Sequence, residues 1–156
     1  MTLLILASIL SLVYSIYWIV SSDKLPESLS STYYILKDKG WIFQLYMIVI
    51  GFSLLPVWLS VSESNLQFLV FTACSSVLFI SASPSFKLKL DGKIHYTAAI
   101  MCCISALLWQ ILEGLYDITL LTSFICFLFW IRYKSWFFWI ELAVLYSVIF
   151  NIWRLL

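Results

Sequence analysis

The chain has 156 residues, of which 63% are hydrophobic and 11% are charged, and its formal net charge is +1. This composition leaves too little polar surface to coat a water-soluble globule of this length. The near-neutral charge, with basic residues spread along the chain, also excludes nucleic acid as an expected partner. We therefore expect an all-α integral membrane protein that is surrounded by a lipid bilayer.

Six apolar stretches are long enough to cross a hydrocarbon core of about 30 Å, which takes roughly 20 helical residues. They are continuously apolar, whereas the strands of a transmembrane barrel alternate apolar and polar residues. The sequence therefore predicts a single membrane domain over residues 1–156, built as a six-helix transmembrane bundle. The expected spans are about 2–20, 41–61, 66–83, 96–113, 118–132 and 136–154.

The first expected span carries a small polar stripe formed by Ser8, Ser11 and Ser15. Residues at this spacing share one face of a helix. Small and polar side chains let membrane helices approach closely and hydrogen-bond to one another. We expect the stripe to face other helices.

The longest connection, residues 21–40, contains its own helix signals. Pro26 suits a first helical position, Glu27 suits the positive end of a helix dipole, and Gly40 suits a helix stop. Three residues recur at helical spacing between them: Leu29, Tyr33 and Leu36. The pattern predicts a short interfacial helix on the cytoplasmic surface. It is favoured as a plain interfacial helix, with a lid or partner-docking element as the alternative.

The connection over residues 84–95 has two interpretations. Residues 87–90 and 93–96 alternate around Asp91-Gly92, which is typical of a type I′ hairpin. Alternatively, Asp91 caps the start of the fourth span. The cap is favoured because the connection is short and the span needs a start.

The basic residues predict how the protein is oriented. Eight of the nine Lys and Arg residues lie in the first, third and fifth connections: Lys24, Lys37, Lys39, Lys87, Lys89, Lys93, Arg132 and Lys134. The positive-inside rule places these connections in the cytoplasm and both termini on the non-cytoplasmic side of a plasma or bacterial inner membrane. We expect the basic residues to contact anionic lipid headgroups.

Glu141 is the ionisable residue of greatest interest, because it lies about 7.5 Å deeper than Trp136 along the last expected span. Carboxylates within spans are costly and are functional candidates by default. Arg132, at the end of the preceding span, is the nearest candidate partner by depth. A structural Arg132–Glu141 ion pair and a functional carboxylate both remain open.

Other polar residues are expected near Glu141, at the cytoplasmic end of the bundle. Gln44 enters at the same depth on the second span. His95, the single histidine, lies one helical turn from Asp91 and is either a proton carrier or a surface residue bonded to Asp91 or water. The loop helix can add Glu27 and Ser28. The candidate site is therefore Glu141, His95, Gln44, Asp91, Arg132, Glu27 and Ser28.

A second polar group is expected at the opposite end: Gln110, Glu113, Asp117, Asn151 and Arg154. These positions also suit ordinary interface residues. Ser147, Asn151 and Arg154 share one helix face, which suits either a buried polar seam or half of a pore lining.

No metal site or cofactor is expected. The four cysteines, Cys74, Cys102, Cys103 and Cys126, lie within expected spans and show no metal-ligand spacing. Three function classes remain. The favoured one is a non-enzymatic scaffold, accessory subunit or lipid-interacting protein, either as a homo-oligomer or with a membrane-protein partner. The alternatives are a small-solute or ion transporter or channel using Glu141, and a membrane enzyme with a cytoplasmic-side site near His95.

Overall fold

The computed structural model describes residues 1–21, 24–82 and 91–156, and within these ranges all regular secondary structure is helical. This confirms the all-α prediction. The elements are α1 (Thr2–Ser21), α2 (Thr32–Ile35), the 3₁₀ helix η1 (Lys37–Lys39), α3 (Trp41–Val61), α4 (Gln67–Ala82), α5 (Asp91–Leu112), α6 (Tyr116–Tyr133) and α7 (Trp136–Leu155).

Five of these helices, α1, α3, α5, α6 and α7, are long and apolar enough to cross a membrane, which indicates a membrane location. The fourth helix, α4, has 16 residues. That is shorter than the roughly 20 residues that a full crossing takes. A bundle of six transmembrane helices is therefore not confirmed and remains a prediction.

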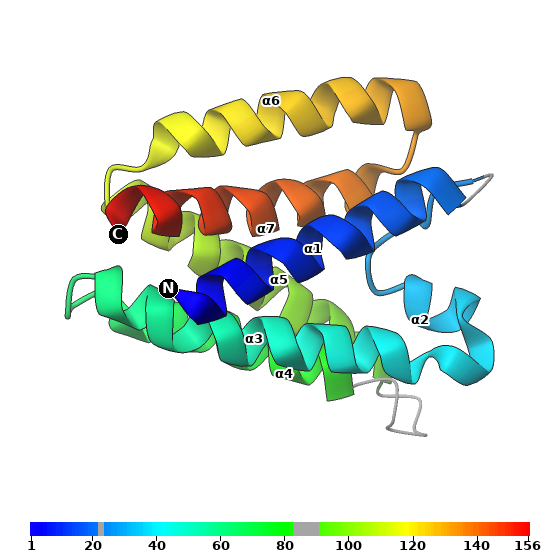
Figure 1. Ribbon diagram of the computed structural model, residues 1–156, viewed down its shortest axis with the longest axis horizontal. Coiled ribbons are helices and arrows are strands. Elements are labelled where there is room, and N and C mark those ends of the chain that lie inside the picture. The colour runs from blue at the N-terminus through cyan, green and yellow to red at the C-terminus, as the bar shows by residue number, and fades with distance from the viewer. Residues whose placement is uncertain (22–23, 83–90) are drawn as a thin grey trace.

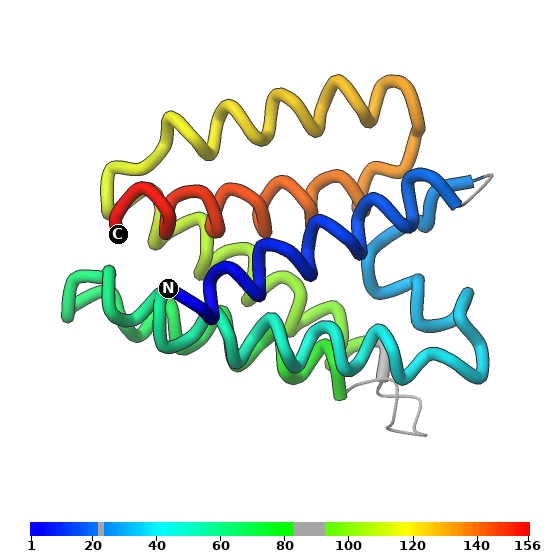
Figure 2. The backbone as a smooth tube through the Cα atoms, viewed as in Figure 1, coloured from blue at the N-terminus to red at the C-terminus, as the bar shows by residue number. Residues whose placement is uncertain are grey.

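The long helices run back and forth between two ends of an elongated bundle (Figures 1 and 2). One end carries α2, residues 24–40 and the turn between α6 and α7, and we call it the α2 end. Both chain termini and the turns that follow α3 and α5 lie at the opposite end, the terminal end (Figure 1). The described basic residues other than Arg154 therefore gather at the α2 end.

The helices α3, α4 and α5 pack as consecutive antiparallel neighbours, α1 packs on α3, and α7 contacts α1, α3 and α5. Gly51 allows α3 to approach α4 closely, since a Cβ at this position would lie 3.4 Å from the Leu78 side chain. Ala98 and Ala106 on α5 are buried. Small residues thus lie where membrane helices meet most closely.

The serine stripe of α1 faces α7, as the sequence predicted. The Tyr146 hydroxyl donates a hydrogen bond of 3.1 Å to Ser15 Oγ, and the Trp153 indole N–H donates one of 3.0 Å to Ser8 Oγ. Ser11, between them, is buried. The stripe therefore joins the first helix of the chain to the last.

The interfacial helix expected from Pro26 onward is wrong in its extent, because α2 begins only at Thr32 and has four residues. Ser28 and Ser31 bond to each other's backbone: Ser31 Oγ accepts from Ser28 N–H at 3.1 Å, and Ser28 Oγ accepts from Ser31 N–H at 3.1 Å. Such local bonds compete with helical hydrogen bonding. Pro26 is buried instead of opening a helix.

Gly40 separates η1 from α3 without a left-handed conformation, since its φ is −55°. A Cβ at this position would lie 2.7 Å from the Tyr33 ring. The glycine expected to stop a helix is therefore required for close packing of the loop against the start of α3.

The helix α5 begins at Asp91, so residues 93–96 are helical and the hairpin interpretation is wrong for them. The other expected strand, residues 87–90, lies outside the described residues. The fourth span therefore starts earlier than the expected Tyr96, and a capping role for Asp91 stays a prediction.

The helix α6 lies at the edge of the bundle, alongside α7 (Figure 1). Thr122 is buried there, whereas most of its large apolar side chains are exposed: Leu120, Leu121, Phe124, Ile125, Phe127, Leu128, Phe129 and Ile131. A helix with apolar residues on nearly all sides suits a lipid environment.

Candidate functional site

The segment from Leu25 to Thr32 docks on the start of α7. The Phe138 N–H donates a 3.0 Å hydrogen bond to the Glu27 carbonyl oxygen, and Ser135 Oγ donates one of 3.3 Å to the Leu25 carbonyl oxygen. The first N–H groups of a helix have no partner within the helix. The loop backbone therefore caps α7 in place of a side chain.

Glu141 holds the same loop one turn deeper. Its Oε2 accepts a 2.6 Å hydrogen bond from the Leu29 N–H. A carboxylate that accepts from a backbone N–H makes a short and comparatively strong hydrogen bond. The loop carbonyls of residues 25 and 27 and the N–H of residue 29 thus bind α7 at alternate loop positions, before the chain turns into α2.

Arg132, the other candidate partner of Glu141, lies elsewhere. Its guanidinium is exposed and sits 5.8 Å from the centre of the Tyr133 ring. Over the part of the chain that the structure describes, no ion pair joins Arg132 to Glu141. Leu29 takes the place that the sequence assigned to Arg132.

The loop is also tied to α1 and α3. Thr32 Oγ1 donates to the Leu29 carbonyl oxygen and lies 2.6 Å from the Tyr14 hydroxyl of α1. The Tyr14 ring stacks on Tyr46 of α3, with ring centres 4.1 Å apart. The loop is therefore a fixed cap that joins three helices.

Beneath this cap is a central cavity of about 100 Å³, lined by α3, α4, α5, α7 and by Leu29 and Ser30 of the loop. Glu141 is the one charged residue among its described lining residues, and three lining cysteines are free thiols: Cys74, Cys102 and Cys103. An apolar cavity of about 150 Å³ can hold benzene. This one has room for only a small guest.

The two carboxylate oxygens of Glu141 differ. Oε2 is bonded to Leu29, whereas among the described residues no hydrogen bond reaches Oε1. Glu141, a lining residue of the cavity, thus keeps one carboxyl oxygen without a hydrogen bond among the described residues. Arg132 does not neutralise it, so the cavity holds a carboxyl group whose direct partner is the loop.

Gln44 and His95 do not line the central cavity. The Gln44 side-chain amide donates a hydrogen bond of 3.1 Å to the Ser81 carbonyl oxygen, and Ser81 Oγ donates one of 3.0 Å to the Gln44 carbonyl oxygen. These two bonds join α3 to α4. His95 is half-buried and its ring lies edge-on to Tyr96. Gln44 and His95, which were expected to share a site with Glu141, therefore make their contacts elsewhere in the bundle.

The remaining candidates belong to the loop and to the start of α5. The Glu27 side chain is exposed, and its backbone carbonyl provides the contact with α7. Ser28 Oγ lies 2.9 Å from Ser30 Oγ within the loop. Asp91 provides the first residue of α5. The structure brings Glu141 to the loop backbone and not to these side chains.

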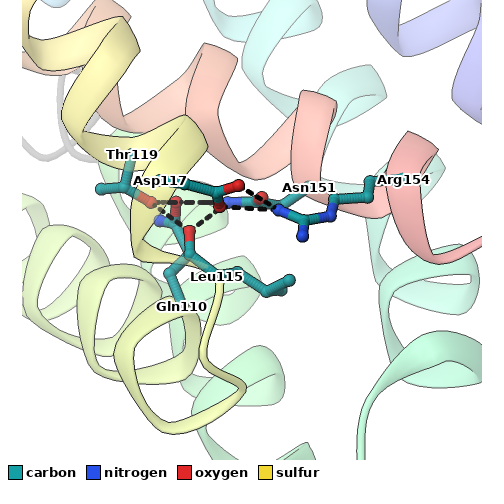
Figure 3. Close-up of polar contacts among 6 residues, drawn as sticks. All are labelled: Gln110, Leu115, Asp117, Thr119, Asn151 and Arg154. Carbon is teal, nitrogen blue, oxygen red and sulfur yellow. Dashed lines mark hydrogen bonds and ion pairs between the residues drawn. The ribbon is translucent and has the colours of Figure 1, made fainter.

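The second polar group forms a network at the terminal end (Figure 3). Gln110 and Asn151 are both 0% exposed. Asn151 Nδ2 donates hydrogen bonds of 2.9 Å to Gln110 Oε1 and of 3.3 Å to the Leu115 carbonyl oxygen. Thr119 Oγ1 donates a hydrogen bond to the same Gln110 oxygen. Gln110 Nε2 donates 3.1 Å to the Ala106 carbonyl oxygen. This network joins α5, α6 and α7.

Gly114 shapes the turn that brings Leu115 into this network. Its φ is +72°. The Leu115 N–H donates a hydrogen bond of 2.8 Å to the Gln110 carbonyl oxygen, and the Gly114 N–H donates one of 3.1 Å to the Ile111 carbonyl oxygen. This is the Schellman pattern that ends helices at a left-handed glycine.

On the surface beside this turn, Arg154 pairs with Asp117 at 2.6 Å.

The sequence grouped Gln110, Glu113, Asp117, Asn151 and Arg154 at this end. The structure joins Gln110 to Asn151 and Asp117 to Arg154, whereas Glu113 Oε1 accepts a separate hydrogen bond of 2.9 Å from the Glu63 N–H. Sequence reasoning missed Thr119 and the Leu29 N–H. A threonine three residues into a helix gives little signal. The run of Ser and Thr from Ser28 to Thr32 was the available sign that this segment bonds to its own backbone.

Comparison with known proteins gave no match to a family model, to a curated protein or to a solved structure. The function must therefore be inferred from the geometry of the chain itself.

Proposed function

We propose that the protein is a non-enzymatic, lipid-interacting membrane protein that serves as a scaffold or accessory subunit. The observation that carries this proposal is the bond from Leu29 N–H to Glu141. A carboxylate within a span is a functional candidate unless a structural partner accounts for it. Here the partner is the backbone of a loop that also caps α7.

The other polar side chains support the same proposal. A transport path would need Gln44, Ser147 and Asn151 to join Glu141 along one continuous surface. Gln44 is bonded to Ser81, and Ser147 Oγ donates to the Val144 carbonyl oxygen of its own helix. Asn151 belongs to the buried network at the terminal end. These hydrogen bonds join neighbouring helices at Gln44 and Asn151 and lie within one helix at Ser147.

The surface of the molecule suits this role. The exposed apolar side chains of α6 require lipid or another membrane protein around them. The basic residues of the α2 end suit anionic headgroups, which are abundant in cytoplasmic leaflets. We therefore place the α2 end in the cytoplasm and both termini on the other side of a plasma or bacterial inner membrane.

A transporter is the second candidate, because Glu141 lines the central cavity and its Oε1 has no hydrogen-bond partner among the described residues. One experiment decides between the two. The purified protein is reconstituted in liposomes that contain a pH-sensitive dye, and proton entry is followed under an imposed membrane potential.

We expect proton entry at the rate of protein-free liposomes, for the wild type and for Glu141→Gln alike. Proton entry that the wild type supports and Glu141→Gln abolishes would overturn the proposal in favour of proton-coupled transport. Gln67→Leu is the matched control, because Gln67 is exposed on α4 and does not line the cavity.

A further inference from the structure

A second hollow lies on the outside of the bundle, between α1 and α3, and has a volume of about 500 Å³. Its walls are successive turns of two antiparallel helix faces. The residues that form them include Leu10, Val13 and Tyr17 of α1 and Ile42, Leu45 and Val49 of α3. Val13, Tyr17 and Leu45 are at least half exposed. In a membrane this groove opens to lipid.

The groove is charged at one end. Lys39 of η1 is the one charged residue among the described residues that line it. The neighbouring acidic residue, Asp38, is exposed and is not part of the lining. Tyr17, near the same end, is an aromatic residue of the kind that occupies the headgroup level of bilayers. The groove thus has a cationic mouth and an apolar floor.

The length of the groove matches one leaflet. Ten residues separate Lys39 from Val49, which corresponds to roughly 15 Å along a helix. Half of a hydrocarbon core of about 30 Å has the same depth. A chain that begins at Lys39 and lies along the groove would therefore end near the middle of the bilayer.

We propose that this groove binds one acyl chain of an anionic phospholipid and that the phosphate of this lipid binds Lys39. The inference rests on the lipid-interacting part of the proposed function and adds the class of lipid and its site. A lipid with a zwitterionic headgroup fills the groove equally well with its acyl chain but lacks the net negative charge that Lys39 attracts.

The test is native mass spectrometry of the purified full-length protein titrated with phosphatidylglycerol and, separately, with phosphatidylcholine of the same acyl chains. We expect the first phosphatidylglycerol to bind about fivefold more tightly than phosphatidylcholine, as one basic residue near a headgroup should produce. Lys39→Gln should remove this preference and leave phosphatidylcholine binding unchanged. Leu45→Trp, which fills the groove, should weaken both lipids.

Lys134→Gln is the control, because Lys134 is an exposed basic residue at the same end of the bundle, in the turn between α6 and α7. Equal loss of preference in Lys134→Gln and Lys39→Gln would overturn the assignment, and so would a preference that survives Lys39→Gln. Both outcomes leave the proposed function standing, whereas proton entry that depends on Glu141 would overturn that function without touching the groove. Circular dichroism of each variant verifies that the helices are retained.

Discussion

The two ends of the bundle use buried polar groups in different ways. At the terminal end, Gln110, Asn151 and Thr119 bond to one another, and their helices lock together side chain to side chain. At the α2 end, Glu141 bonds to the backbone of a loop and borders a cavity. The first arrangement holds helices to one another, whereas the second holds the loop over the central cavity.

This difference assigns different tasks to the two ends. Within a membrane, an unsatisfied polar group has no water to bond to, so the buried network is strongly tied to its geometry, although Asn151 Oδ1 has no hydrogen-bond partner in it. The loop at the α2 end is held by several hydrogen bonds, including the one to Glu141, and these bonds can open without separating the helices. The terminal end should therefore determine global stability, and the α2 end should determine local opening.

The largest expected effect comes from breaking the buried network at the terminal end. Gln110→Leu removes the oxygen that accepts from both Asn151 and Thr119, so we expect a loss of about 2 kcal/mol in the free energy of unfolding. Unfolding in mixed detergent micelles, followed by circular dichroism, measures it. Gln67→Leu, which removes an exposed glutamine bonded to the Leu59 carbonyl oxygen, should change stability far less. Equal effects would contradict the assigned role of the network.

The next effect is local and belongs to Glu141. Glu141→Leu removes the acceptor of the Leu29 N–H, so we expect the amide hydrogen of Leu29 to exchange about tenfold faster, which corresponds to about 1.4 kcal/mol of opening free energy. Glu141→Gln keeps an oxygen that can accept and should give a smaller change. Hydrogen exchange with mass spectrometry resolves the segment, and amides of α5 are the internal reference. Unchanged exchange in Glu141→Leu would show that the loop does not depend on this bond.

The two ends also differ in how far their contacts could be predicted from the sequence. The polar group at the terminal end was predictable because Gln110, Asp117, Asn151 and Arg154 recur near helix ends at fixed depth. The all-α class and the apolar helices were predictable from composition and run length. The partner of Glu141 was not, because side-chain identity predicts charge pairs such as Arg132–Glu141, while the Leu29 N–H is a backbone group that every residue but proline carries.

The loop explains a second miss. Helical spacing of Leu29, Tyr33 and Leu36 predicted one helix, and the structure gives α2 and η1 with bends and a turn before them. Lys37 has a φ of +49°, which breaks the helix between α2 and η1. Helical spacing indicates which residues are buried, and Leu29 is buried, but a turn that is held by Glu141 can bury the same side chain.

Thr119→Val tests a single hydrogen bond of the same buried network. Valine keeps the branched shape of threonine but cannot donate to Gln110 Oε1, which still accepts from Asn151. We expect the free energy of unfolding to fall by about 1 kcal/mol. This is more than the loss of an ordinary hydrogen bond in a membrane costs and less than leaving a buried polar group without any partner costs. The same unfolding assay measures it. In the double variant with Gln110→Leu the two effects should not add, because the bond that they share is already lost. Additive effects would show that the two residues act independently.

The smallest effect is expected at the surface of the same end, where Arg154 binds Asp117. Both side chains are about half exposed, at 48% and 58%, and exposed ion pairs contribute little because water and salt screen them. Asp117→Asn should therefore leave the unfolding midpoint nearly unchanged, and the small difference should vanish at high salt. A large effect that salt does not reduce would show that the ion pair supports the buried network beneath it. In that case the stability of the terminal end would depend on its surface as well as on Gln110 and Asn151.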